Sequence, residues 1–240
     1  MSKSSIVADI GADALVSRLE THWQSYTNEP TTVEINGKTF TGLPSVYSPA
    51  APLTKCVANS VSPPPGARGL DMGCGSGVLG IFALERGASS MVFADINPAA
   101  LANARENITR HGVADRATVV ESDLFSALGD ERFDYIVFNS PFLYSKTDLV
   151  EALGAESNLF RPGVPPPSSF FDVGYKLLNR FFSQVRDHLA PDGVLQMAFS
   201  NIGNSEELAR LLEEYKFTIE STHTEVTGMI EWRSLRLIPV

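Results

Sequence analysis

The residues with the clearest chemical potential lie in the segment LDMGCGSGVLG, which joins a short apolar stretch to an apolar run of helical length. Gly73, Gly75 and Gly77 have no side chains, so a ligand can approach the backbone closely at these positions. A helix that begins after them would present free N–H groups and a partial positive charge, which suit a carboxylate or a phosphate. The segment therefore predicts a turn that binds a nucleotide-type cofactor.

A carboxylate is expected near this turn. Asp95 ends the next strand that the sequence predicts, where its two oxygens could accept both hydroxyls of a ribose. Gly75, Gly77 and Gly80 also satisfy the pattern G-x-G-x-x-G, so a dinucleotide and an NAD(P)-dependent oxidoreductase remain an alternative. Both kinds of cofactor contain a ribose, so the spacing between the glycine turn and Asp95 does not distinguish a dinucleotide from another nucleotide-type cofactor.

A second acidic residue, Asp123, follows the third predicted strand in VVESDLF. The carboxyl end of a strand in an open parallel sheet is where ligands bind, and Asp123 there could accept the amino group of an adenine. It could equally cap a short helix over Leu124–Leu128, because Asp is favoured at that position. The sequence leaves both roles open.

The elements that must position these residues alternate between strand and helix. Strands are predicted at 69–72, 91–95, 118–121, 135–139, 194–199, 218–224 and 232–238, and the main helices at 78–86, 98–111, 173–189 and 205–215. Such alternation is typical of a parallel α/β sheet covered by helices on both faces. The last two strands are separated only by a short turn, so they predict an antiparallel hairpin. We therefore predict a seven-stranded, mostly parallel sheet of Rossmann-like α/β class.

The chain before the first of these strands predicts a small N-terminal extension. Residues 6–26 have the pattern of an amphipathic helix, and Asn36-Gly37 between β-forming residues predicts a hairpin. A short helix is expected over 53–61, before the breaker SPPPGARG. We therefore divide the chain into an extension at 1–60 and a main domain at 61–240.

Composition restricts the classes of protein that remain. The chain has 240 residues and a net charge of −9, which disfavours nucleic acid as a partner. Its two cysteines, Cys56 and Cys74, and its four histidines show no metal-ligand spacing, so no metal is expected. The sequence has no signal-like N-terminus and no apolar run long enough for a membrane span, so a cytoplasmic protein is expected.

Taken together, four segments resemble the motifs of class I S-adenosylmethionine-dependent methyltransferases. DMGCGSG looks like the first motif, ADINPAAL the second and ESDLF the third, while FNSPF is similar to the N-P-P-Y/F tetrad of N-methyltransferases such as the release-factor glutamine methyltransferases. The resemblance implies S-adenosylmethionine as the cofactor and 61–240 as the domain that binds it. It implies that the cofactor is held by Asp71, Gly73, Gly75, Gly77, Asp95, Ile96, Asp123, Leu124 and Asn139.

The resemblance also assigns the catalytic segment to Asn139, Ser140, Pro141 and Phe142. In the family, the asparagine side chain and the next backbone carbonyl accept hydrogen bonds from the target NH₂, and the aromatic ring stacks on the target. The present chain departs from the family at Ser140, where the tetrad has proline. Without the upstream motifs, this segment would be interpreted as an ordinary strand-ending turn.

The acceptor is less closely defined than the reaction. We expect an amine, amide or guanidine nitrogen of a small molecule, as in secondary metabolism, because the extension is small and the chain is acidic. The alternatives are a glutamine or arginine side chain of a protein, and RNA. A non-catalytic partner protein with the same fold and a homodimer formed through the N-terminal extension also remain open, as does a lid formed by residues 146–171.

Overall fold

The computed structural model describes residues 29–143, 172–228 and 230–240. The helix expected over 6–26 and the lid expected over 146–171 lie outside these residues. Within them, the hairpin expected around Asn36-Gly37 is confirmed as β1 (Thr31–Ile35) paired with β2 (Lys38–Gly42). Asn36 and Gly37 both have positive φ, 51° and 74°, as the tight turn between twisted strands requires.

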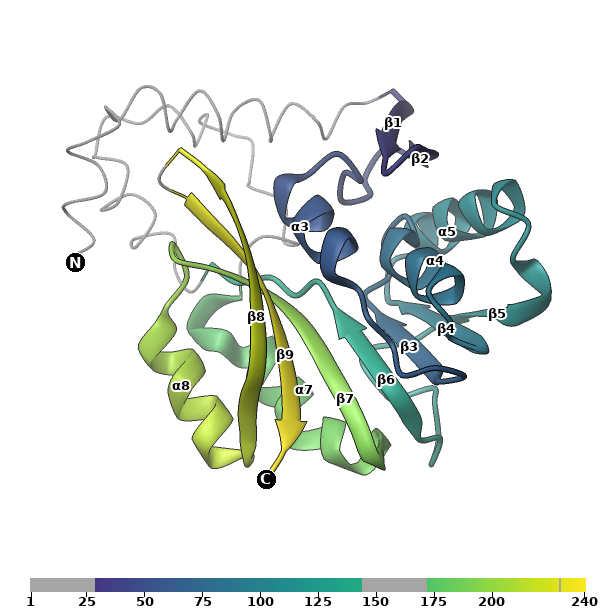
Figure 1. The fold of residues 1–240 in the computed structure, drawn as a ribbon. Coiled ribbons are helices and arrows are strands. Elements are labelled where there is room, and N and C mark those ends of the chain that lie inside the picture. The colour runs from purple at the N-terminus through teal and green to yellow at the C-terminus, as the bar shows by residue number, and fades with distance from the viewer. Residues whose placement is uncertain (1–28, 144–171, 229) are drawn as a thin grey trace.

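A seven-stranded sheet forms the centre of the molecule (Figure 1). Its order is β5-β4-β3-β6-β7-β9-β8, and the first five of these strands run parallel. β9 is antiparallel to both of its neighbours, so the predicted C-terminal hairpin is confirmed. The strands are β3 (Arg68–Met72), β4 (Ser90–Asp95), β5 (Ala117–Glu121), β6 (Phe133–Phe138), β7 (Leu189–Ser200), β8 (Phe217–Thr227) and β9 (Ile230–Pro239).

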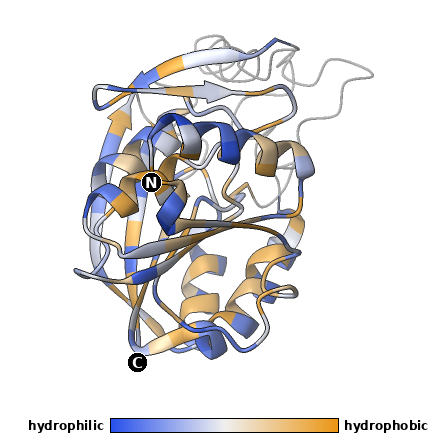
Figure 2. Ribbon diagram, turned by 90° about the vertical axis from the view of Figure 1, so that its right-hand side faces the viewer, coloured by the Kyte–Doolittle hydropathy of each residue, from blue (hydrophilic) through white to orange (hydrophobic). Residues whose placement is uncertain are grey.

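Helices cover both faces of this sheet. One face carries α3 (Pro52–Ser60), α4 (Val78–Glu85) and α5 (Pro98–Arg110), and the other carries α7 (Lys176–His188) and α8 (Ser205–Glu214) (Figure 1). Most helices contain both hydrophobic and hydrophilic residues, which alternate along each helix (Figure 2). α4 is the exception, since VLGIFAL is buried throughout, and it packs against α3, α5 and two strands.

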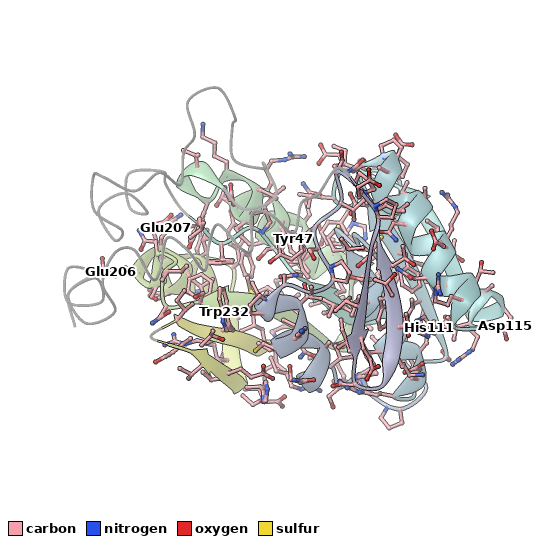
Figure 3. All side chains as sticks on the ribbon, turned by 90° about the horizontal axis from the view of Figure 1, so that it is seen from above. Tyr47, His111, Asp115, Glu206, Glu207 and Trp232 are labelled. Carbon is pink, nitrogen blue, oxygen red and sulfur yellow. The ribbon has the colours of Figure 1, made fainter. Side chains whose placement is uncertain are left out.

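The N-terminal hairpin is attached to α5 by two buried asparagines. Asn107 Oδ1 accepts a hydrogen bond from the Thr41 N–H at 2.9 Å, and its Nδ2 donates to the carbonyl oxygens of Thr41 and Ser76. Asn103 bonds the hairpin in the same way, through Thr41 and the Leu43 N–H. The hairpin also packs Phe40 against His111, with the two rings tilted and their centroids 4.5 Å apart, and His111 lies beside these strands in Figure 3. The boundary drawn after residue 60 stays a prediction.

One predicted element is wrong. Residues 124–128 form turns instead of the expected short helix, and Leu124 has a positive φ of 51°. The hydroxyl of Ser122 donates to the Leu124 carbonyl at 2.6 Å and accepts the Ala127 N–H at 3.1 Å. These local bonds to the backbone compete with the bonds of a helix, which explains why the helical signal fails here.

Candidate active site

A cavity of about 570 Å³ opens at the carboxyl ends of β3, β4 and β6. A volume of this size lies within the usual range for cofactor and ligand sites. Its walls come from seven parts of the chain that the fold brings to one rim. They comprise Ser45–Tyr47, Leu53 and Thr54, Asp71–Ser76 with Val78 and Leu79, Asp95–Asn97 with Ala100, Ser122–Leu124, Phe138–Phe142, and Leu177 on α7. Tyr47 projects over the middle of the molecule when it is seen from above (Figure 3).

The glycine turn lies between β3 and α4, as the sequence predicts. Gly73, Gly75 and Gly77 have φ values of 60°, 52° and 79°, a region that favours glycine. Gly73 and Gly75 line the cavity, whereas Gly77 does not. A Cβ on Gly77 would meet Ala104 on α5 at an ordinary contact distance of 3.4 Å, so the positive φ at the start of α4, and not close packing, favours glycine here.

Asp71 fixes the position of the glycine turn through a hydrogen bond. Its side chain is buried, and Oδ2 accepts a hydrogen bond from the Gly80 N–H at 2.8 Å, which ties β3 to the first turn of α4. Burial raises the pKa of the Asp71 carboxyl well above its ordinary value, and the nearby Asp95 raises this pKa further. Asp71 also borders the cavity, but the contact observed here positions the turn.

Asp95 connects the turn with the second strand of the site. Its Oδ2 accepts the Gly75 N–H at 2.9 Å and its Oδ1 accepts the Asn97 N–H at 2.9 Å. Each oxygen has a second lone pair that can face the cavity. Ile96 follows at once, lines the cavity and is 64% exposed, so its apolar side chain is accessible to the flat face of a purine.

The state of Asp95 predicts how cofactor binding depends on pH. Burial raises the pKa of the Asp95 carboxyl, and only the ionised form can accept two ribose hydroxyls without giving up an oxygen to a proton. We expect the Kd for S-adenosylhomocysteine to rise as the pH falls through this elevated pKa, by up to about tenfold per pH unit. Calorimetric titration across the acidic range measures this dependence.

Asp95→Asn provides the matched control for the pH titration. This variant keeps the size of the side chain but cannot ionise, so its binding should be weaker near neutral pH and nearly constant through the same range. An equally steep pH dependence in Asp95→Asn would show that another group controls binding.

Asp123 and Leu124 border the cavity beside β5, but the structure gives Asp123 a partner that the sequence did not indicate. Arg180 on α7 donates to Asp123 Oδ2 at 2.8 Å, and both side chains are about half exposed. The capping role considered for Asp123 is absent because there is no helix to cap. Contact of Asp123 and Leu124 with the adenine stays a prediction.

The segment Asn139–Phe142 follows β6 and faces the same cavity. Asn139 Nδ2 donates to Thr54 Oγ1 on α3 at 3.3 Å, so the carbonyl end of the Asn139 amide is the end that can accept from a ligand. The Ser140 hydroxyl is the only buried side-chain polar atom in the described residues that lacks a hydrogen-bond partner. Phe142 is buried edge-to-face against Trp232 at 6.4 Å, and its carbonyl accepts from Tyr175.

The sequence analysis did not identify the residue that orients Asn139. Thr54 orients Asn139 from a helix 85 positions away in the chain, and no local motif marks it. At the start of α7, Asp172 accepts the N–H groups of Leu177 and Leu178 at 2.8 and 2.7 Å. Asp172 is therefore a capping residue for α7, and the buried Tyr175 belongs to the core.

Comparison with known proteins shows the family of this chain. Residues 38–160 match the family model described as "Methyltransferase small domain". A "Putative protein N5-glutamine methyltransferase" of Methanocaldococcus jannaschii is 30% identical over 78% of this chain and 89% of its own length. The release factor glutamine methyltransferase of Geobacter sulfurreducens is 36% identical over 55% of this chain, and the match spans 45% of that enzyme.

Solved structures show the same fold at low sequence identity. The ribosomal protein L11 methylase of Lactobacillus delbrueckii subsp. bulgaricus has a TM-score of 0.55 at 21% identity, covering 78% of this chain and 76% of its own. The 16S rRNA N2 G1207 methyltransferase of T. Thermophilus, solved with AdoMet and guanosine, has a TM-score of 0.59 at 22% identity, covering 88% and 50%. At these identities the likeness concerns the fold.

The fold, the glycine turn and the matches define a class I methyltransferase that uses S-adenosylmethionine. The chain belongs to the methyltransferase small domain family. The expected class of enzyme and its cofactor are thereby confirmed, and the oxidoreductase alternative gains no support. Within the residues that the structure describes, no helix is long and apolar enough to cross a membrane.

The residues present suit this cofactor chemically. The bare backbone at Gly73 and Gly75 admits the methionine part, Asp95 offers acceptors for the ribose, and Ile96 offers an apolar surface for the adenine. Asn139–Phe142 lies on the same rim, so the cavity can hold a donor and an acceptor together.

Proposed function

We propose that this chain methylates the side-chain amide nitrogen of a glutamine in a protein. The observation that carries the proposal is the position of Asn139 and Ser140 in the wall of the cavity that the glycine turn also lines. The small-molecule acceptor expected from the sequence finds no support among the relatives. Three of them have printed names that specify glutamine in a protein, which supports the alternative of a protein side chain.

The residues that line the cavity support separate roles in binding the methyl donor and in holding the acceptor nitrogen. S-adenosylmethionine supplies a methyl group on a sulfonium, which is already activated for transfer. The task of the protein is to hold the acceptor nitrogen in line, and positioning of this kind is a large catalytic contribution. Asn139 Oδ1 and the Ser140 carbonyl can each accept one amide N–H, and both also stabilise positive charge that develops on nitrogen.

The unpartnered Ser140 hydroxyl gives this proposal a specific test. A buried hydroxyl without a partner costs about 1–3 kcal/mol, and a rotation of the Ser140 side chain on substrate binding would let it donate to the carbonyl oxygen of the carboxamide. We expect Ser140→Ala to raise the KM for the amide substrate about three- to tenfold, and to leave the affinity for S-adenosylhomocysteine unchanged. Steady-state kinetics and calorimetry measure the two quantities.

Thermal unfolding separates recognition by Ser140 from a structural role. Because the hydroxyl makes no bond in the free protein, Ser140→Ala should keep or slightly raise Tm. A lower Tm together with an unchanged KM would show that the hydroxyl supports the fold and does not contact the substrate.

The acceptor itself can be identified by the chemistry of its product. The protein is incubated with cell lysate and S-adenosylmethionine labelled in the methyl group, and the labelled macromolecules are hydrolysed in strong acid. In acid, an N-methylated glutamine amide is hydrolysed to glutamate and labelled methylammonium, which alkali then releases as volatile methylamine, and this is the result we expect. Label retained as a non-volatile methylated arginine, or label lost to ribonuclease before hydrolysis, would contradict the proposal.

A further inference from the structure

Three side chains with metal-ligand chemistry meet on the far side of α3 from the cavity. They are Cys56 on α3 and His223 and Glu225 on β8, and one potential ligand atom from each lies within 4.8 Å of the other two. Their spacing in the sequence, with 166 positions between the cysteine and the histidine, explains why no metal was expected. None of the three belongs to the methyltransferase site.

The fold explains why these side chains converge. His223 and Glu225 are two positions apart on a strand, so both side chains point to the same face of the C-terminal hairpin. α3 packs across that face, against β8 and β9. The Cys56 thiol donates to the carbonyl oxygen of Trp232 on β9 at 3.1 Å, and Figure 3 shows Trp232 beside α3.

The exposed part of the cluster is oriented by a chain of hydrogen bonds. His223 Nε2 lies 3.2 Å from Glu225 Oε1, and the Asn59 side chain donates to the same oxygen at 2.6 Å. Asn36, in the turn of the N-terminal hairpin, donates in turn to Asn59 Oδ1 at 2.9 Å. Such outer partners fix the direction of ligands at metal sites.

We propose that Cys56, His223 and Glu225 form a zinc site that fastens the C-terminal hairpin to α3. Sulfur, imidazole nitrogen and carboxylate oxygen are the three ligand types that Zn²⁺ takes in proteins, and water completes a tetrahedron. A mixed set with a thiolate selects zinc over magnesium and calcium, which take oxygen ligands. On binding, the Cys56 S–H bond breaks, sulfur keeps the electron pair as a zinc ligand, and the proton leaves to solvent.

Two features of the metal-free cluster fit this chemistry. The buried Cys56 thiol donates its proton to a backbone carbonyl in the metal-free protein, so the position of its sulfur is fixed before an ion binds. The open side is formed by His223 and Glu225, which are exposed and half-buried, so an ion can enter from solvent.

The site has a consequence for the neighbouring cavity. α3 also carries Leu53 and Thr54, which line the cavity, and Thr54 contacts Asn139. A metal that fixes α3 against the hairpin therefore stabilises the wall that orients the acceptor. The zinc site is structural, because no ligand of the metal lines the cavity, and it does not depend on the function proposed above.

Cobalt(II) and zinc(II) chloride are the probes for this site. The full chain, stripped with a chelator, should bind one equivalent of Co²⁺ with a sulfur-to-cobalt charge-transfer band, and Zn²⁺ should displace the cobalt. Cys56→Ser should lose the band, whereas Cys74→Ser, which changes the other buried thiol, should retain it. At zinc concentrations about a hundred times Kd, Tm should rise by roughly 5–10 °C.

Two surface variants keep the test valid if a change at the buried Cys56 impairs folding. His223→Ala and Glu225→Gln alter solvent-accessible side chains, and each should weaken zinc at least tenfold while Tm in chelator stays near the wild-type value. Absence of the charge-transfer band in the wild-type protein, or zinc affinity unchanged in both surface variants, would overturn the proposal.

Discussion

Replacement of Asn139 by alanine should reduce kcat about 100- to 1,000-fold and leave the affinity for S-adenosylhomocysteine within about threefold of the wild-type value. The variant removes an acceptor that holds the target nitrogen, whereas the glycine turn and Asp95, which line the same cavity, stay intact. Single-turnover kinetics with the glutamine substrate and calorimetry with S-adenosylhomocysteine give the two values.

Thr54→Val is the matched control for this prediction. Thr54 Oγ1 accepts the Asn139 Nδ2 hydrogen, so valine keeps the shape of the side chain but frees the Asn139 amide to turn. We expect a smaller loss of kcat, of about three- to tenfold, because a net hydrogen bond contributes about 1 kcal/mol. Equal losses of cofactor affinity and turnover in Asn139→Ala would contradict the role assigned to Asn139.

Asn107→Ala should lower the free energy of unfolding by about 3–5 kcal/mol. Asn107 is fully buried, and its three hydrogen bonds join α5, the N-terminal hairpin and the backbone of the glycine turn at Ser76. Alanine leaves the Thr41 N–H and the Ser76 carbonyl buried without this partner. Denaturant unfolding followed by circular dichroism measures the change.

An exposed position on the same helix separates this effect from a general sensitivity of α5. Glu106 is next to Asn107, and its carboxylate pairs only with Arg110 at 3.2 Å among the described residues. Glu106→Ala should change stability by less than about 1 kcal/mol, as is usual for an exposed ion pair. Equal destabilisation by the two variants would show that the buried network is not what holds the hairpin.

Much of the fold follows from local patterns in the sequence. The hairpin at Asn36-Gly37 depends on backbone conformations that those two residues favour, and the glycine turn depends on an apolar strand followed by bare backbone. The prediction of a helix at 124–128 was wrong because the Ser122 side chain forms local hydrogen bonds to the backbone, and these compete with the bonds of a helix. The spacing of apolar residues does not reveal this competition.

The parts of the site that could not be predicted depend on contacts between distant residues. The glycine pattern marks Gly77 as a residue for ligand approach, but Gly77 does not line the cavity and instead provides the positive φ at the start of α4. Thr54 meets Asn139, and Cys56 meets His223, only after α3 packs on the sheet. The spacing of residues along the chain does not indicate such contacts. The sequence therefore identifies at most one residue of each pair.

The central claim is that one cavity brings a methyl donor against a nitrogen held by Asn139. A crystal structure of the protein with S-adenosylhomocysteine and a glutamine-containing substrate fragment tests it directly. We predict that the ribose lies on Asp95, and that the amide nitrogen lies between Asn139 Oδ1 and the Ser140 carbonyl with its open side toward the sulfur. A sulfur atom directed away from Asn139, or a glutamine amide bound outside this cavity, would contradict the account.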